Sequence, residues 1–249
     1  MSAAALRALH VPGRPLVLVN VWDAASARLA VAAGFPVVAT SSVAVAESLG
    51  YHDHQDAPAA EMFAAAARIA RVVDVPVTVD AEAGYGLPAG ELVERLLAAG
   101  AVGCNLEDTD HASGGLADPA AQAAWLAEVR ATAKAALVIN ARVDVFIRSR
   151  TEPRALLGEA TKRALAYLDA GADCVYPIGL RDPAVIRDLV DAVSPAPVNV
   201  LTQPDGPPPA TFAELGVARV SMGGSVWRAN QSVLAARFAE LAALRGVDR

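Results

Sequence analysis

The sequence repeats one kind of junction along the chain, in which an Ala-rich stretch reaches a glycine and then passes into a short apolar run. The clearest examples are "AAGFPVVAT", "AAGAVGCNLED", "DAGADCVYP" and "ELGVARVSM". Their glycines, Gly34, Gly100, Gly171 and Gly216, fit the left-handed position that closes an α-helix, where a residue without Cβ has no steric penalty. Each junction therefore predicts a helix that ends and a strand that follows at once, which favours a chain built from βα units.

Short β-branched runs predict eight strands, at residues 16–20, 37–40, 75–80, 102–107, 137–140, 174–176, 198–201 and 219–222. Runs such as "LVLV" and "ALVI" are apolar on both faces, which is typical of parallel strands covered on both sides. Amphipathic patterns predict helices at 59–73 and 91–99, and a last helix at 226–245. Eight units in 249 residues average about 31 residues each, the length of a βα unit.

That count favours an α/β fold of the closed (β/α)₈ TIM-type barrel class, as a single domain over residues 1–249. A doubly wound open sheet is the alternative, but it usually has fewer strands. The Pro-rich stretch at 202–210 predicts a loop on the barrel rim rather than a domain boundary.

Composition excludes several classes of protein. Hydrophobic residues make up 54% of the chain and charged residues 19%, which excludes a disordered chain. The net charge of −6 gives no reason to expect nucleic acid or an anionic membrane as a partner. No apolar run reaches the ~18 residues of a membrane span, and none at the N-terminus suits a signal peptide. Cys104 and Cys174 fall inside predicted strands, so we expect them in the core of a reduced, cytoplasmic protein.

Carboxylates follow the ends of several predicted strands, where barrels of this class carry their chemistry. Asp80 ends the third strand and Glu82 follows it, Glu107 ends the fourth, and Asp53 lies in the loop after the second. Unpaired anions gathered in one cavity would not all stay ionised, whereas a divalent cation would stabilise them together. Oxygen ligands suit Mg²⁺ or Mn²⁺, so the pattern predicts a metal site.

Arg142 follows the fifth strand, and its planar guanidinium can hold a substrate carboxylate by two hydrogen bonds. A metal ion beside such an arginine would form a receptor for a 2-oxo acid and would stabilise an enolate. Asp108 and Asp144 are better interpreted as supports for loops or helices. His10 is expected at the surface.

The chain has only two lysines, Lys134 and Lys162, and neither follows a predicted strand. A Schiff-base mechanism needs a lysine at the end of a barrel strand, so the sequence favours metal-assisted chemistry instead.

The segments "NVWDAASARLA", "TSSVAVAESLGYHD", "VDAEAGYG", "NLED" and "NARVD" together resemble the isocitrate lyase/phosphoenolpyruvate mutase superfamily along almost the whole chain. The resemblance implies that Asp80 is the principal Mg²⁺ ligand. It implies that Glu82, Glu107 and Asp53 hold the metal directly or through water, and that Arg142 binds the substrate carboxylate. It further implies that Ser41 and the backbone of Ser42 and Val43 bind the far side of a 2-oxo acid. A dimer or tetramer with an exchanged C-terminal helix is implied as well.

The chain departs from the family in the loop after the fourth strand. The lyases for isocitrate and methylisocitrate carry Lys-[Lys/Arg]-Cys-Gly-His there, with the cysteine as general acid, whereas this chain reads "EDTDHASGGLAD". The mutase's gating loop is not matched either, and Glu82 replaces the commoner aspartate. The two loop differences argue against isocitrate lyase and phosphonopyruvate mutase activity, whereas Glu82 could still reach a metal-bound water.

The sequence thus favours a Mg²⁺-dependent carbon–carbon lyase for a small 2-oxo or 2-hydroxy acid, and a dicarboxylate in particular. Tyr85, His111 and a metal-bound water are the candidates for the general acid or base. The alternatives are a decarboxylase or hydrolase for oxaloacetate-like or phosphonopyruvate-like substrates, and a protein that binds 2-oxo acids without turnover.

Overall fold

The computed structural model describes residues 2–244 and contains a strand at each of the eight expected positions. The first expected strand is divided at Leu18 into β1 and β2. The strands are β1 (Leu16–Val17), β2 (Val19–Val21), β3 (Val38–Thr40), β4 (Val77–Asp80), β5 (Gly103–Glu107), β8 (Val138–Arg142), β9 (Cys174–Tyr176), β10 (Asn199–Leu201) and β11 (Arg219–Ser221). A short antiparallel hairpin of β6 (Thr109–Asp110) and β7 (Gly115–Leu116) follows β5.

The barrel strands form a closed ring in which neighbouring strands are parallel. One sheet has the order β2-β3-β4-β5-β8-β9 and another has the order β1-β11-β10. The divided first strand joins the two sheets on one side, because β1 pairs with β11 while β2 pairs with β3. A parallel bridge between Val175 and Val198 joins β9 to β10 on the other side. The fold is therefore the expected TIM-type barrel.

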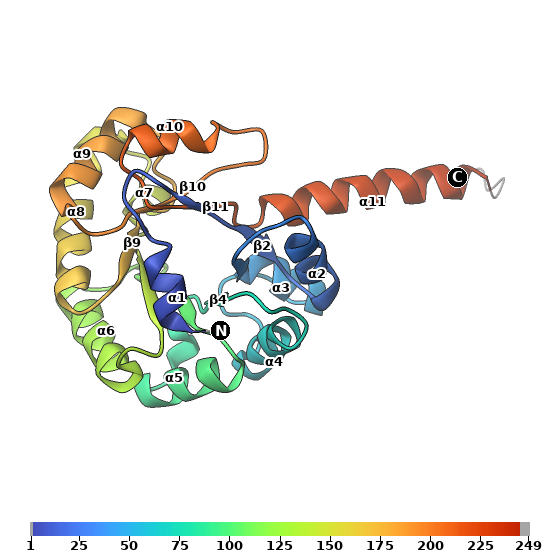
Figure 1. Cartoon of the computed structure of the whole chain (residues 1–249), viewed down its shortest axis with the longest axis horizontal. Coiled ribbons are helices and arrows are strands. Elements are labelled where there is room, and N and C mark those ends of the chain that lie inside the picture. The colour runs from blue at the N-terminus through green and yellow to red at the C-terminus, as the bar shows by residue number, and fades with distance from the viewer. Residues whose placement is uncertain (1, 245–249) are drawn as a thin grey trace.

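Helices lie outside the strands in a ring (Figure 1). They are α2 (Ala24–Ala32), α3 (Ser42–Leu49), α4 (Ala59–Ala70), α5 (Ala89–Ala98), α6 (Pro119–Ala133), α7 (Val145–Arg148), α8 (Pro153–Asp169), α9 (Pro183–Val193) and α10 (Pro209–Glu214). The glycine prediction is confirmed: Gly34, Gly100, Gly171 and Gly216 all have φ between 81° and 97°, one residue beyond a helix C-cap. The same junction thus leads from a helix into a strand of the barrel at four places along the chain.

A short helix that the sequence analysis missed, α1 (Ala3–Ala8), covers the N-terminal end of the barrel. Its Leu6 is fully buried against Leu18 and Val138. This helix also buries His10, which was wrongly expected at the surface. His10 Nδ1 lies 2.9 Å from the Leu6 carbonyl oxygen, and burial lowers the pKa of His10 to about 4.

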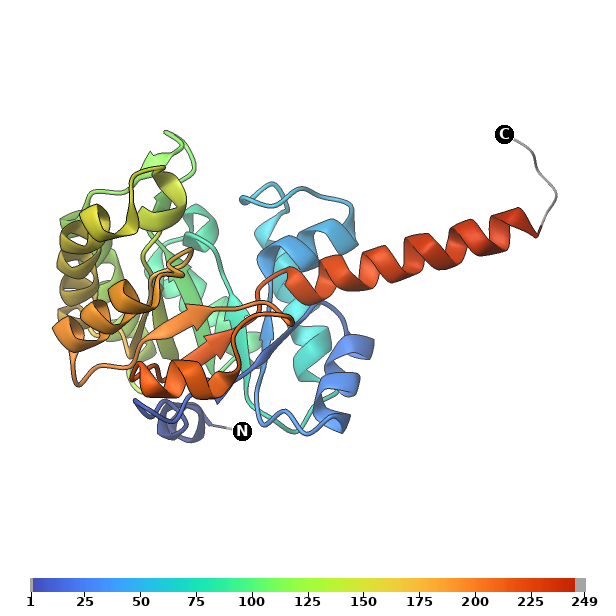
Figure 2. The same cartoon turned by 90° about the horizontal axis from the view of Figure 1, so that it is seen from above.

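The last helix, α11 (Ser225–Ala243), projects away from the barrel, as both views show (Figures 1 and 2). None of its residues is buried. The predicted helix ran two residues further, and Arg245 lies outside the described residues. Within residues 2–244, every helix is too short or too polar to span a lipid bilayer.

Candidate active site

The predicted site residues lie at the C-terminal ends of adjacent strands. Asp80 ends β4, Glu107 ends β5 and Arg142 ends β8. In the strand register, Glu107 is paired with Arg142, and Asp80 is paired with Asn105 two residues before Glu107. The parallel sheet therefore brings these side chains to one edge of the barrel, as the sequence predicted.

Asp80 is held by the neighbouring strand and helix. Its backbone N–H donates to Thr40 Oγ1 at 2.8 Å, and its Oδ2 accepts from the Ser42 N–H at 3.2 Å. The other oxygen, Oδ1, is buried and has no hydrogen-bond partner. Burial raises the pKa of Asp80, although the positive charge of Arg142 opposes the rise. A buried carboxylate oxygen without a donor is costly unless a cation accompanies it.

The loop between α3 and α4 contacts one of the carboxylates. Glu82 Oε2 accepts from the Gln55 N–H of this loop at 2.7 Å. Burial, together with the negative charges of Asp80, Asp53 and Glu107, raises the pKa of Glu82 to about 8. In the same loop, Asp53 Oδ1 is buried without a hydrogen-bond partner. Asp80 and Asp53, which come from separate segments, thus each have one buried carboxylate oxygen without a hydrogen bond.

Arg142 differs from its expected role in one respect. Its Nε and Nη2 each donate to a carboxylate oxygen of Asp144 at 2.7 Å, and Nη2 also forms an ion pair with Glu107. The two-hydrogen-bond contact that we expected Arg142 to make with a substrate carboxylate is therefore made with Asp144, two residues further along the chain. Among residues 2–244, no hydrogen bond occupies Nη1, and that nitrogen is the one available for a ligand.

A buried network behind the site was not found from the sequence. Asp108 is fully buried and accepts from the Asp144 N–H at 2.8 Å, from Arg163 Nη1 at 3.0 Å and from the Tyr167 hydroxyl at 2.7 Å. Asp108 and Asp144 are therefore supports, as expected, and they join Arg142 to two residues of α8. Arg163 and Tyr167 are four residues apart on one helix face, which is the only sequence signal that could have indicated the pair.

Tyr85 lies in the 3₁₀ turn η1 (Gly84–Gly86), which follows β4. It has φ 56°, and its buried hydroxyl has no hydrogen-bond partner. Burial, followed by the charge of Glu82, raises the pKa of Tyr85 well above its usual value. Gly84 has φ 84° and passes so close to Trp125 that a Cβ there would lie 2.7 Å from the indole ring. Close packing thus fixes the turn that carries the tyrosine.

His111 lies in the hairpin loop after β5, and its Nε2 is 2.7 Å from Glu107 Oε1. Its ring is 5.8 Å, centroid to centroid, from that of His54. Glu107 is therefore shared between Arg142 on one side and His111 on the other.

The expected serine segment begins α3. Ser41 is buried and occupies the N-cap position, but its side chain makes no capping hydrogen bond. The Ser42 N–H is bound to Asp80, as described above. Val43 lies beside the start of α11, because a Cβ at Gly224 would lie 2.6 Å from Val43 Cγ1. The segment reaches the site through its backbone.

The carboxylates of the site fit a divalent cation through two of their oxygens. The side chains of residues 2–244 include no group of three His, Cys, Asp or Glu residues close enough to hold one ion. Direct coordination by all four predicted carboxylates is therefore not present in this arrangement. The unsatisfied Oδ1 atoms of Asp80 and Asp53 still fit Mg²⁺, which commonly takes one or two direct carboxylates and keeps several waters.

The chain is similar over most of its length to several known proteins. The family model for phosphoenolpyruvate phosphomutase matches residues 6–242. The crystal structure of a phosphonomutase candidate from Burkholderia cenocepacia is 43% identical and has a TM-score of 0.90, covering 96% of this chain and 99% of that one. Escherichia coli 2-methylisocitrate lyase is 31% identical over 86% of this chain and 78% of its own. A Rhodopseudomonas palustris oxaloacetate decarboxylase is 33% identical over 84% and 72%.

Proposed function

The chain belongs to the isocitrate lyase/phosphoenolpyruvate mutase superfamily of lyases and mutases, and we propose that it is a Mg²⁺-dependent carbon–carbon lyase. Its substrate would be a small 2-oxo or 2-hydroxy acid, and a dicarboxylate in particular. The observation that carries the proposal is the pair of buried, unsatisfied carboxylate oxygens on Asp80 and Asp53, near the positive charge of Arg142.

Asp80 and Asp53 would hold the cation, and Glu82 and Glu107 would support it through water. Mn²⁺ could replace Mg²⁺, because both accept oxygen ligands. When bound, the ion supplies stabilisation for the negative charge that develops on the 2-oxo oxygen. The raised pKa values of Asp80 and Glu82 describe the site without a cation, since a nearby divalent charge would favour the ionised carboxylates.

Arg142 would bind the substrate carboxylate through Nη1, the nitrogen that Asp144 and Glu107 leave free. Its other nitrogens are held by two carboxylates, so the guanidinium is fixed before the substrate arrives. Ser41, together with the backbone of Ser42 and Val43, would bind the far end of the acid from the start of α3. A fixed cation at one end and donors at the other orient the scissile bond.

Two side chains could move a proton. Burial, followed by the charge of Glu82, holds the pKa of the Tyr85 hydroxyl well above its usual value, so the hydroxyl keeps its proton and can donate it. His111 is held by Glu107 in the loop after β5, where it could carry a proton between the site and solvent. Either residue would take the place of the cysteine that the family's lyases carry in that loop.

The same arrangement would serve a decarboxylase. Loss of CO₂ from an oxaloacetate-like acid leaves the same negative charge on the 2-oxo oxygen as carbon–carbon cleavage does. The 33% identity to an oxaloacetate decarboxylase favours this as the second candidate. A phosphonopyruvate-type reaction is the third, given the similarity to the Burkholderia protein.

The test is a turnover assay with Mg²⁺ over a panel that contains 2-methylisocitrate, 2,3-dimethylmalate, oxaloacetate and phosphonopyruvate. We expect cleavage that EDTA abolishes, and a loss of at least about a hundred-fold in the isosteric variant Asp80→Asn, because the ligand oxygen loses its charge. Asp118→Asn, at the exposed N-cap of α6, is the matched control and should keep full activity.

Two results would contradict the proposal. Equal activity in Asp80→Asn and the wild type would remove Asp80 from the metal site. Saturable binding of a 2-oxo acid without product across the panel would favour a binding protein instead.

We also propose that α11 packs on a second copy of the chain. Leu234, Phe238 and Leu241 follow one another at spacings of four and three residues, so they share one face, and all three are exposed. An apolar stripe on a projecting helix is typical of an interface. We expect an oligomer in light scattering, and dissociation in Phe238→Ser but not in the control Leu29→Ser on α2. A monomeric wild-type protein would refute this part.

A further inference from the structure

A cavity lies on the same rim of the barrel as the carboxylates but shares no residue with them. It is bordered by the segment after β9 and the segment after β10, and by the helices α9 and α10 that follow. Its volume is about 260 Å³, which equals about nine water-sized volumes at about 30 Å³ each. We call it the β9–β10 pocket.

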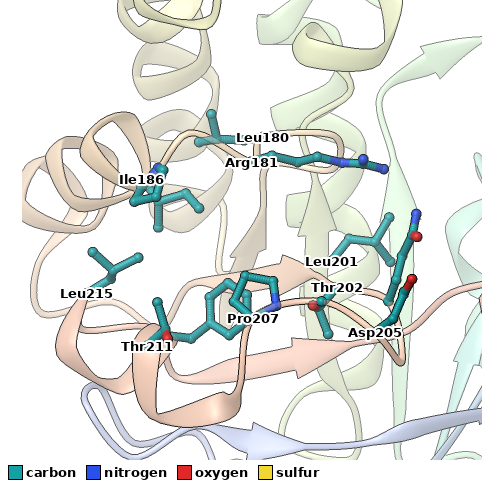
Figure 3. A pocket seen from close by; sticks show the side chains of 13 residues that line it. Leu180, Arg181, Ile186, Leu201, Thr202, Asp205, Pro207, Thr211 and Leu215 are labelled. Carbon is teal, nitrogen blue, oxygen red and sulfur yellow. The ribbon is translucent and has the colours of Figure 1, made fainter.

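The pocket has two chemically different ends (Figure 3). Leu180, Ile186 and Leu215 line one end with apolar side chains, and Leu180 and Ile186 are almost completely buried. At the other end, Figure 3 shows the guanidinium of Arg181 and the carboxylate of Asp205. Neither forms an ion pair with any residue in the described range 2–244. The two free charges therefore remain available to a ligand.

Thr202 supplies a third feature. It is only 8% exposed, and its hydroxyl oxygen is buried without a hydrogen-bond partner. Gly206 passes so close that a Cβ there would lie 2.5 Å from this oxygen. A buried hydroxyl without a partner is destabilising, so its position on the wall of an open cavity points to a ligand that completes it.

We propose that the β9–β10 pocket binds a small aliphatic carboxylic acid with a branched chain and a polar group on its α-carbon. The branched chain fills the apolar end, and the carboxylate pairs with Arg181. The Thr202 hydroxyl bonds to a polar atom of the ligand. An acid of six carbons, such as leucine or 4-methyl-2-oxopentanoate, has about the number of heavy atoms that the volume accepts.

The charge of Asp205 distinguishes the amino acid leucine from the 2-oxo acid 4-methyl-2-oxopentanoate. An α-ammonium group would pair with its carboxylate, whereas an α-keto group would not. The same charge repels a second carboxylate on the ligand, so the pocket disfavours the dicarboxylates proposed for the metal site. The two sites therefore differ in the acids that they select.

Calorimetric titration of the metal-free protein tests the proposal with leucine, 4-methyl-2-oxopentanoate and the uncharged 4-methylpentanamide as probes. We expect at least one acid to bind with a Kd below about 1 mM, and the amide to bind at least about ten-fold more weakly. Arg181→Gln should weaken the acid about ten-fold or more, and Ile186→Phe should fill the cavity and abolish binding. Thr202→Val keeps the shape and should weaken binding several-fold.

Arg71→Gln, an exposed arginine at the end of α4, is the matched control and should bind as the wild type does. Asp80→Asn should also leave this affinity unchanged, which separates the pocket from the metal site. The proposal is overturned if neither acid binds. It is also overturned if Arg181→Gln and Ile186→Phe bind like the wild type, or if Asp80→Asn alone abolishes binding.

Discussion

Replacement of Asp144 by alanine should lower the free energy of unfolding, because it removes one partner of a buried ion pair. The Asp144 side chain is 0% exposed and that of Arg142 is 11% exposed, and two hydrogen bonds of 2.7 Å join them. Removing one partner from a buried ion pair costs about 3–5 kcal/mol, because the other charge stays buried. Glu107 still faces Arg142 in the variant, so we expect the lower end, about 3 kcal/mol.

Urea denaturation followed by circular dichroism measures this loss, with linear extrapolation and an unchanged m-value. The matched control is Asp188→Ala, which breaks an ion pair with Arg154 whose side chains are 42% and 58% exposed. An exposed pair contributes about 0–1 kcal/mol, so the control should lie within that range. If both variants lost the same small amount, burial would not be what makes the Arg142–Asp144 pair strong, and our reasoning would be refuted.

Three further predictions concern other parts of the barrel. Because burial lowers the pKa of His10 to about 4 from 6.5, the unfolded chain binds this proton first as the pH falls. The free energy of unfolding should therefore drop by about 3 kcal/mol between about pH 6.5 and 4, and His10→Gln should flatten that part of its pH profile. Burial raises the pKa of the Cys104 and Cys174 thiols to about 12, so neither thiol should react with an aromatic disulfide reagent until denaturant is added. Rapid reaction of the native protein would contradict the burial of these two side chains. Gly84→Ala should lower the free energy of unfolding by about 1–3 kcal/mol in urea, since its φ is 84° and Trp125 fills the space; an unchanged value would mean that the turn can relax.

Much of the fold was predictable because its signals are local. The glycine junctions set the left-handed helix ends, and the β-branched runs between them are long enough to identify each strand. The ends of those strands then placed Asp80, Glu107 and Arg142 on one rim without any knowledge of packing.

The features that were missed depend on contacts between distant segments. His10 is buried because α1 folds over the end of the barrel, and a six-residue helix has too short a pattern to detect. Arg163 reaches Asp108 across 55 positions of sequence. The pairing of Arg142 with Asp144 was missed for a different reason: either a substrate or a neighbour can satisfy a guanidinium, and the sequence does not say which.

The chain of contacts from α8 through Asp108 and Asp144 to Arg142 has a consequence for anyone who reshapes this enzyme by random mutagenesis. Arg163 and Tyr167 lie on the outer ring, where a screen would treat them as neutral scaffold. Substitutions there would shift the guanidinium and reduce turnover, and they would be mistaken for changes at the chemical centre. Libraries that aim at new substrates should therefore keep both residues fixed and vary the loops on the rim.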